Sequence, residues 1–294
     1  MDKILRCITS NGGVMASAID STNLVYTAQR VHKTSPVVSA ALGRLLTASS
    51  MMGAALKQKE ATITLRVAGG GPVGSLVAVA DSRGNCRGYA ANPSVELERK
   101  ANGKLDVGAA VGREGLLYVM RDYGTGEPYI GQTPLVTGEI AEDITSYYAH
   151  SEQIPTVCAL GVLVDREDAS VLLAGGLLLQ LLPGASEEEI AMLERNVAAL
   201  EPVTTMLAKG MSIEEMCRKA LSGFEVEVLD EMEVGYVCNC SRDRVVRAVS
   251  LLSREELISM AEEPQGFAEA QCHFCDKTYR ISSEELYQMA AAKK

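Results

Sequence analysis

Apolar and polar residues alternate along several short stretches before residue 183, as they do in half-buried strands. Ile63, Leu65 and Val67 alternate with polar neighbours. The glycine-rich run GGGPVG at 69–74 separates this stretch from SLVAVAD at 75–81, which indicates a hairpin. Further strand-like stretches are CRGYA (86–90), GLLYVM (115–120), TVCALGVLV (156–164) and ASVLLAGGLLLQLL (169–182), while AEDITSYYAHSEQ (141–153) has a helical pattern. We therefore expect an α+β (mixed α/β) N-terminal core domain over residues 1–183.

One apolar run, from Pro36 to Leu56, is long enough to cross a membrane. Arg44 interrupts its middle, and small polar residues dilute it. The pattern favours a helix buried at the centre of a globular core, so we expect no membrane association.

The pattern becomes helical after Pro183. Serine precedes glutamate by three residues at Ser186/Glu189, Ser212/Glu215 and Ser253/Glu256, and each pair can close a capping box at a helix start. Ile190, Leu193, Val197 and Leu200 recur at helical spacing and form one apolar face. We expect a helical linker over residues 184–231. Two hypotheses remain for it: a helix packed permanently on its own domain, or a linker that detaches.

Composition and charge narrow the class of protein. The chain has 294 residues, of which 47% are apolar and 22% charged, as in ordinary globular proteins. Its formal net charge is −10, and the segment from Glu231 onward is also net acidic, which argues against nucleic-acid binding. The start of the sequence lacks the pattern of a secretory signal. With eight cysteines, we expect a reduced, cytoplasmic protein.

Four cysteines near the C-terminus form two close pairs, Cys238-Asn-Cys240 and Cys272-His-Phe-Cys275, separated by 31 residues. Four thiolates gathered from two such pairs are typical of a tetrahedral zinc site. We predict that these four cysteines bind one zinc ion in a C-terminal module over residues 232–294, with two short helices between the pairs. The remaining cysteines, Cys7, Cys86, Cys158 and Cys217, are expected to be buried as small apolar side chains.

Oxidation would change this module if each pair closed on itself. Such disulfides enclose only a few residues, and they would not link the two ends of the module as a shared zinc ion does. The spacing therefore permits a switch that unfolds on oxidation. A permanent zinc ribbon with a purely structural metal is the alternative.

The whole chain resembles the heat-shock protein 33 family, the redox-regulated bacterial holdase chaperones. The resemblance lies in the C-x-C…C-x-x-C arrangement and in a series of stretches along the chain. These are RVHKTSPVVSAALGRLLTASSMMGAALK (30–57), AGGGPVGSLVAVAD (68–81), ANPSVEL (91–97), GKLDVGAAVG (103–112), SEQIPTVCALGVLV (151–164), AGGLLLQLLPGA (174–185) and CHFC (272–275). All four cysteine positions of the family pattern are present.

The resemblance implies an ATP-independent chaperone, and not an enzyme, that binds unfolding client proteins under oxidative and heat stress. In the reduced form zinc would be held by the four cysteines and the protein would be inactive. Oxidation would form disulfides Cys238–Cys240 and Cys272–Cys275, release zinc and accompany dimerisation. The apolar face from Ile190 to Leu200 is a candidate client-binding surface. Two alternatives from other classes are a nucleic-acid-binding zinc-ribbon protein and a dithiol oxidoreductase that uses Cys272 and Cys275.

Overall fold

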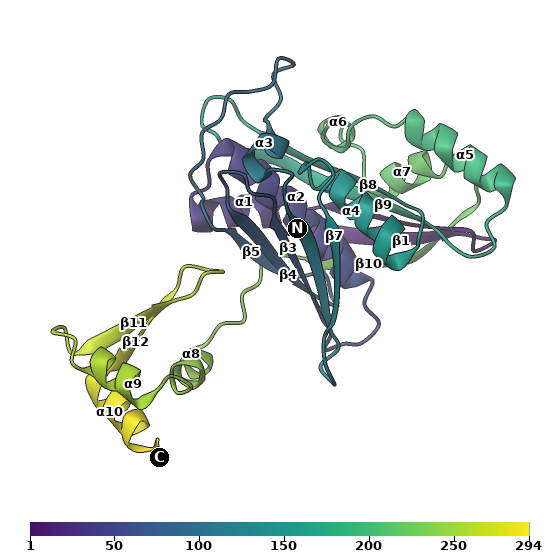
Figure 1. The fold of residues 1–294 in the computed structure, drawn as a ribbon. Coiled ribbons are helices and arrows are strands. Elements are labelled where there is room, and N and C mark those ends of the chain that lie inside the picture. The colour runs from purple at the N-terminus through teal and green to yellow at the C-terminus, as the bar shows by residue number, and fades with distance from the viewer. Residues whose placement is uncertain (294) are drawn as a thin grey trace. The chain divides into compact units, whose positions relative to one another are not determined.

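The computed structural model describes residues 1–293, which fold into two compact units (Figure 1). The first unit spans Met1–Val237 and the second Cys238–Lys294. The mixed α/β class predicted from the sequence is confirmed, since both units combine helices with antiparallel strands.

Two five-stranded antiparallel sheets form the first unit. The first sheet has the order β10-β1-β2-β9-β8, with strands β10 (Val226–Val234), β1 (Asp2–Thr9), β2 (Val14–Asp20), β9 (Val171–Leu181) and β8 (Thr156–Val164). The second has the order β5-β4-β3-β6-β7, with strands β5 (Cys86–Ala90), β4 (Ser75–Asp81), β3 (Thr62–Ala68), β6 (Leu116–Asp122) and β7 (Tyr129–Pro134). Ile63 pairs with Ala80 across β3 and β4, so the predicted hairpin at GGGPVG is confirmed.

Helix α2 (Pro36–Ala54) contacts both sheets and lies between them (Figure 1). It is long and apolar enough to cross a membrane, but 94% of that stretch is buried inside the structure. Small residues allow this close packing, because a Cβ added at Gly53 would lie only 2.6 Å from the Asp81 carbonyl oxygen. The prediction of a buried central helix is confirmed.

The remaining helices of the N-terminal half surround this core. They are α1 (Thr22–His32), α3 (Val107–Val111), α4 (Ala141–Tyr147) and the π-helical turn η1 (Tyr148–Glu152). Helix α1 packs on β9 and α2, and α4 packs on β8. The helical pattern predicted for residues 141–153 is therefore confirmed, with a change from α- to π-helix at Tyr148.

A layer of three helices covers the other face of the first sheet, and we call α5 (Glu187–Ala198), α6 (Val203–Ala208) and α7 (Ile213–Ala220) the helical layer. The predicted capping boxes are present: Ser186 and Glu189 start α5, and Ser212 and Glu215 start α7. The two faces of the sheet thus carry different cores, because side chains alternate along each strand. Ile4 of β1 packs with α2, whereas Leu5 packs with the helical layer.

Strand β10 brings the chain back beside β1, where it forms the edge of the first sheet. The sequence pattern did not indicate this strand. It pairs with β1 from Asp2↔Val234 to Thr9↔Val226. The Lys3 ammonium and the Glu231 carboxylate form an ion pair across these strands at 2.6 Å. The first compact unit therefore continues to Val237, whereas the sequence pattern suggested a linker ending at residue 231.

The second unit is small and contains α8 (Arg242–Val249), α9 (Arg254–Ala261), β11 (Phe267–Gln271), β12 (Thr278–Ser282) and α10 (Ser283–Ala291). The two short helices expected between the cysteine pairs are α8 and α9, and Ser253 and Glu256 form the predicted capping box of α9. Its buried core comprises Val249, Leu257, Ala261, Ala268, Ile281, Leu286 and Ala290. Three of these seven are alanines, so the unit buries few large apolar side chains.

Candidate metal centre

The turn between β11 and β12 carries one cysteine pair. Strand pairing runs from Phe267↔Ser282 to Gln271↔Thr278, which places Cys272 directly after one strand. Within the turn the Cys272 carbonyl oxygen accepts hydrogen bonds from the N–H groups of Cys275 and Asp276, at 3.3 and 2.9 Å. Asp276 adopts φ 63°, a left-handed conformation that aspartate tolerates. This tight turn brings the Cys272 and Cys275 side chains to one side of the hairpin.

The other pair lies immediately before helix α8. The Ser241 hydroxyl accepts a hydrogen bond from the Arg244 N–H and caps the helix, which begins at Arg242, two residues after Cys240. Arg242 in the first turn forms an ion pair with Glu285 of α10 at 2.6 Å. The cap and the ion pair fix the start of α8 and therefore the segment that carries Cys238 and Cys240.

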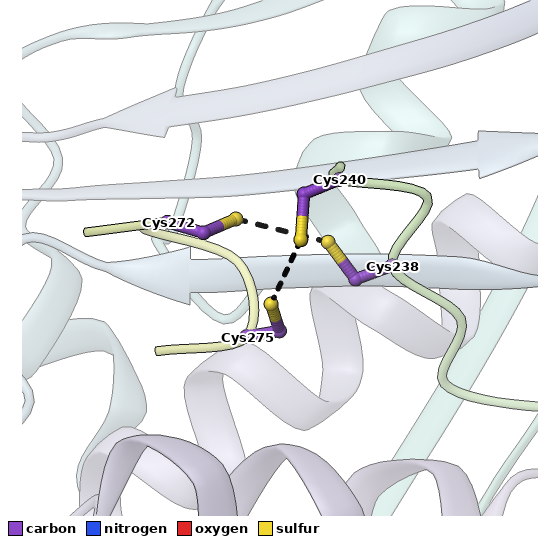
Figure 2. A group of neighbouring side chains, drawn as sticks. All are labelled: Cys238, Cys240, Cys272 and Cys275. Carbon is purple, nitrogen blue, oxygen red and sulfur yellow. Dashed lines mark hydrogen bonds between the residues drawn. The ribbon is translucent and has the colours of Figure 1, made fainter. Parts of the chain in front are cut away.

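The four sulfur atoms converge on one point (Figure 2), and all lie within 4.8 Å of one another. Two distances join the pairs: Cys238 Sγ to Cys272 Sγ is 3.7 Å, and Cys240 Sγ to Cys275 Sγ is 3.3 Å. Zinc with four sulfur ligands at about 2.3 Å places neighbouring sulfurs about 3.8 Å apart. The four cysteines can therefore hold a metal ion, and their geometry and soft donor set are compatible with zinc.

Within residues 1–293, these cysteines form the one group of three or more histidine, cysteine or carboxylate side chains close enough to share an ion. His273 lies in the same turn but outside that group, and its side chain is exposed. All four cysteines are half-buried, which leaves a path for an oxidant or a chelator to reach the sulfurs.

Tyr279 of β12 adds a contact that the sequence pattern did not reveal. Its hydroxyl lies 3.0 Å from Cys240 Sγ, within hydrogen-bonding distance. A tyrosine one residue into a strand has many ordinary uses, so only the folded hairpin shows that its hydroxyl reaches a cysteine. Such neighbours of a ligand orient it and tune its affinity for metal.

The surroundings give the thiols of Cys238, Cys240 and Cys275 unequal acidity. Burial opposes ionisation of Cys240, but hydrogen bonds from Tyr279 and the other thiols outweigh it and lower the pKa of Cys240 to about 7. Burial, with hydrogen bonds to the other thiols, raises the pKa of Cys275 to about 12. Burial also raises the pKa of Cys238. Among these three thiols, Cys240 therefore loses its proton most readily.

Two basic side chains near the centre form ion pairs with carboxylates. Arg280 forms an ion pair with Glu269 at 2.9 Å, and its guanidinium lies over the Phe267 ring at 4.6 Å from the centroid. Together with the Arg242–Glu285 pair, this arrangement ties β11, β12, α8 and α10 around the four sulfurs.

The predicted client-binding residues lie on α5 and just after it, in the first unit. Leu193 is buried against the first sheet, and Val197 and Leu200 are partly buried in the same cluster. Ile190 is half-buried. In this conformation Leu193, Val197 and Leu200 pack in the core between the sheet and the helical layer, so client binding by them requires the helical layer to move and stays a prediction.

Comparison with known proteins identifies the family. The family model described as "Hsp33 protein" matches residues 2–282. The chain belongs to the Hsp33 family. The family resemblance seen in the sequence is thus confirmed over nearly the whole chain.

Named relatives support a chaperone as the class of protein. The 33 kDa chaperonin of Clostridioides difficile (strain 630) is 47% identical, with 98% of each chain covered. That of Acetivibrio thermocellus is 45% identical and covers 98% of this chain and 96% of the relative. The crystal structure of the Hsp33 homologue from Thermotoga maritima superposes with a TM-score of 0.89 at 33% identity, over 98% of this chain and 97% of the other. Membership of the Hsp33 chaperone family implies a non-enzyme.

Proposed function

We propose that this Hsp33-family protein is an ATP-independent holdase whose activity is switched on by oxidation. In the reduced form Cys238, Cys240, Cys272 and Cys275 hold one zinc ion, and the protein is inactive. Oxidation converts these cysteines to disulfides, zinc leaves, and unfolding client proteins bind. The observation that supports this proposal most strongly is the convergence of the four sulfurs within 4.8 Å in a unit with a small core.

The metal accounts for much of the stability of the second unit in this proposal. Its seven buried core residues include three alanines, which bury little apolar area. Structural zinc contributes on the order of 10–16 kcal/mol to folding in small peptides, comparable with the whole net stability of a typical domain at about 5–15 kcal/mol. Removing zinc should therefore unfold α8, α9, β11, β12 and α10 together.

Disulfide pairing decides whether oxidation opens the unit. Two sulfur contacts join the two segments, Cys238 to Cys272 and Cys240 to Cys275, and disulfides formed in that way would keep the segments linked. Pairing within each motif, Cys238–Cys240 and Cys272–Cys275, leaves them unlinked and closes only short loops, which stabilise a fold little. We propose the pairing within each motif. All four sulfurs lie near enough to exchange partners, so peptide mapping under non-reducing conditions tests it directly.

The helical layer is the element that we propose to move next. It buries Leu193, Met206 and Met216 against Leu5 and Leu179 of the first sheet. If the layer detaches, both its apolar face and that of the sheet become available to an unfolding chain, including the face from Ile190 to Leu200. Clients in such a mechanism are recognised by exposed apolar segments and not by sequence.

We further propose that the protein forms a homodimer on activation, is located in the cytoplasm, and has no nucleic-acid or membrane partner. The net charge of −10 supports the absence of a phosphate-binding surface. The names of the relatives, all 33 kDa chaperonins, support protein clients.

One experiment tests the switch. Zinc-loaded reduced protein is treated with peroxide or hypochlorite at raised temperature while zinc release, far-UV helicity and suppression of client aggregation are followed together. We expect all three to change in step. If zinc leaves and aggregation is suppressed no better than before, the switch is wrong; if zinc stays bound and activity is unchanged, the metal is a permanent structural ion. A Cys158→Ala variant, which changes a buried cysteine of the first unit, serves as the control.

A further inference from the structure

Two further cysteines, Cys7 and Cys217, meet inside the first unit. Cys7 lies on β1 and Cys217 on α7, and these two elements contact each other. Both side chains are fully buried in the core between the first sheet and the helical layer. Cys7 and Cys217 therefore share one buried cluster, and their thiols interact with each other, although 209 residues lie between them in the sequence.

The sequence places each cysteine on the face where the two elements meet. Along β1, Leu5 and Cys7 point to the helical layer because side chains alternate between the faces of a strand. Along α7, Ile213, Met216, Cys217 and Ala220 are buried and follow helical spacing.

We propose that Cys7 and Cys217 form a disulfide when the protein meets a hydroperoxide, and that this bond fastens α7 to β1. It would act against the four cysteines of the metal centre. Oxidation there releases the second unit, whereas oxidation here retains part of the helical layer on the sheet. The pair would thereby limit how far the first unit opens under oxidant.

The reaction begins with local opening of α7. This helix has only eight residues, too few to be stable without packing. Because each thiol is covered by the other element, lifting α7 exposes both at once. A hydroperoxide then oxidises one of the two thiolates to a sulfenic acid and leaves as water or an alcohol. When α7 packs again, the other thiol attacks that sulfur, a disulfide forms, and the sulfenic oxygen leaves as water.

The interaction between the two thiols shifts their acidity in opposite directions in the packed state. Donation from Cys217 lowers the pKa of Cys7, which outweighs the effect of burial. The same interaction, with burial, raises the pKa of Cys217. No oxidant reaches either thiol in that state, so once α7 has opened either thiol can react first and the other then resolves the sulfenic acid.

The other buried cysteines of the first unit provide controls. The Cys86 thiol donates a hydrogen bond to the Leu46 carbonyl oxygen at 3.6 Å, and burial raises the pKa of Cys86. Burial likewise raises the pKa of Cys158. Cys86 and Cys158 are as buried as the proposed pair, or nearly so, but we expect neither to join a disulfide.

The test uses the full-length zinc-loaded protein and hydrogen peroxide at raised temperature. Free thiols are then blocked with an alkylating reagent, and peptides are mapped by mass spectrometry under non-reducing conditions. We expect a cross-linked peptide that joins Cys7 to Cys217 in the unaltered protein and in Cys158→Ala. It should be absent from Cys7→Ala and Cys217→Ala. The proposal is overturned if α7 has opened and closed under peroxide and Cys7 and Cys217 are then found only in separate, alkylated peptides.

Hydrogen exchange measures the consequence. After oxidation, amides of α7 should exchange at least about tenfold more slowly in the unaltered protein than in Cys217→Ala, as a cross-link restricts opening. Equal rates in a protein that carries the cross-link would refute the fastening role. That role rests on the proposed function, whereas the disulfide itself requires only local opening. Zinc release and client protection without a cross-link would reject this inference alone; a cross-link without client protection would reject the holdase and leave the disulfide.

Discussion

Removal of zinc under reducing conditions should unfold the second unit and leave the first intact. Helices α8, α9 and α10 hold 25 of the 93 α-helical residues in residues 1–293, so about a quarter of the helical signal depends on the metal. The helical layer holds 26 more, but its core does not include the four cysteines. Metal removal alone at room temperature should therefore spare it, and loss of about half of the helical signal should require heat as well.

The assay is far-UV circular dichroism at 222 nm during titration with a strong chelator, with zinc measured in parallel. We expect loss of about a quarter of the ellipticity in proportion to the zinc removed, and recovery when zinc is restored. Unchanged ellipticity after complete zinc removal would contradict this expectation and show that the unit folds on its apolar core alone. Loss of about half at room temperature would show instead that the helical layer depends on the metal.

Further predictions concern single residues. Tyr279→Phe removes the hydroxyl that lies beside Cys240 and should weaken zinc binding about tenfold without changing the fold. Zinc affinity is measured in competition with a chromophoric chelator, and an unaltered affinity would show that the Tyr279 hydroxyl does not contribute to binding. Zinc affinity should fall as pH is lowered, because Cys275 must lose a proton to bind zinc and its pKa of about 12 keeps it protonated without metal. An affinity that does not depend on pH would contradict this. Met216→Ala, at a fully buried position of α7, should destabilise the helical layer by about 2–5 kcal/mol and lower the temperature of activation, measured by client protection against temperature. Ile190→Glu should weaken client binding in oxidised protein, measured as reduced protection from aggregation, if the α5 face is the client surface.

Much of the core could be predicted from local pattern. Strand β3 alternates strictly, and β8 and β9 have long β-branched or leucine-rich runs between turn residues. The serines of the capping boxes predict where α5, α7 and α9 begin, because a helix cap depends only on residues close in the sequence. The four cysteines could be grouped because ligand spacing is a strong constraint on chemistry.

Other elements depend on partners distant in the chain. Strand β2 is buried on both faces, so it shows no alternation, and β10 carries several glutamates, which are uncommon in strands. The strand conformation of β10 comes from pairing with β1, which lies far away in the sequence. The contact of Tyr279 with Cys240 and that of Cys7 with Cys217 are equally non-local, so neither could be inferred before the fold was known.

Suppression of client aggregation measures whether the redox state of the four cysteines controls chaperone activity. A thermally unfolding client is mixed with zinc-loaded reduced protein, with oxidised protein, or with oxidised protein returned to reductant and zinc, and light scattering is followed. We expect aggregation with the reduced form, protection with the oxidised form, and loss of protection on reversal. Equal protection by reduced and oxidised protein would contradict the claim that the four cysteines control chaperone activity.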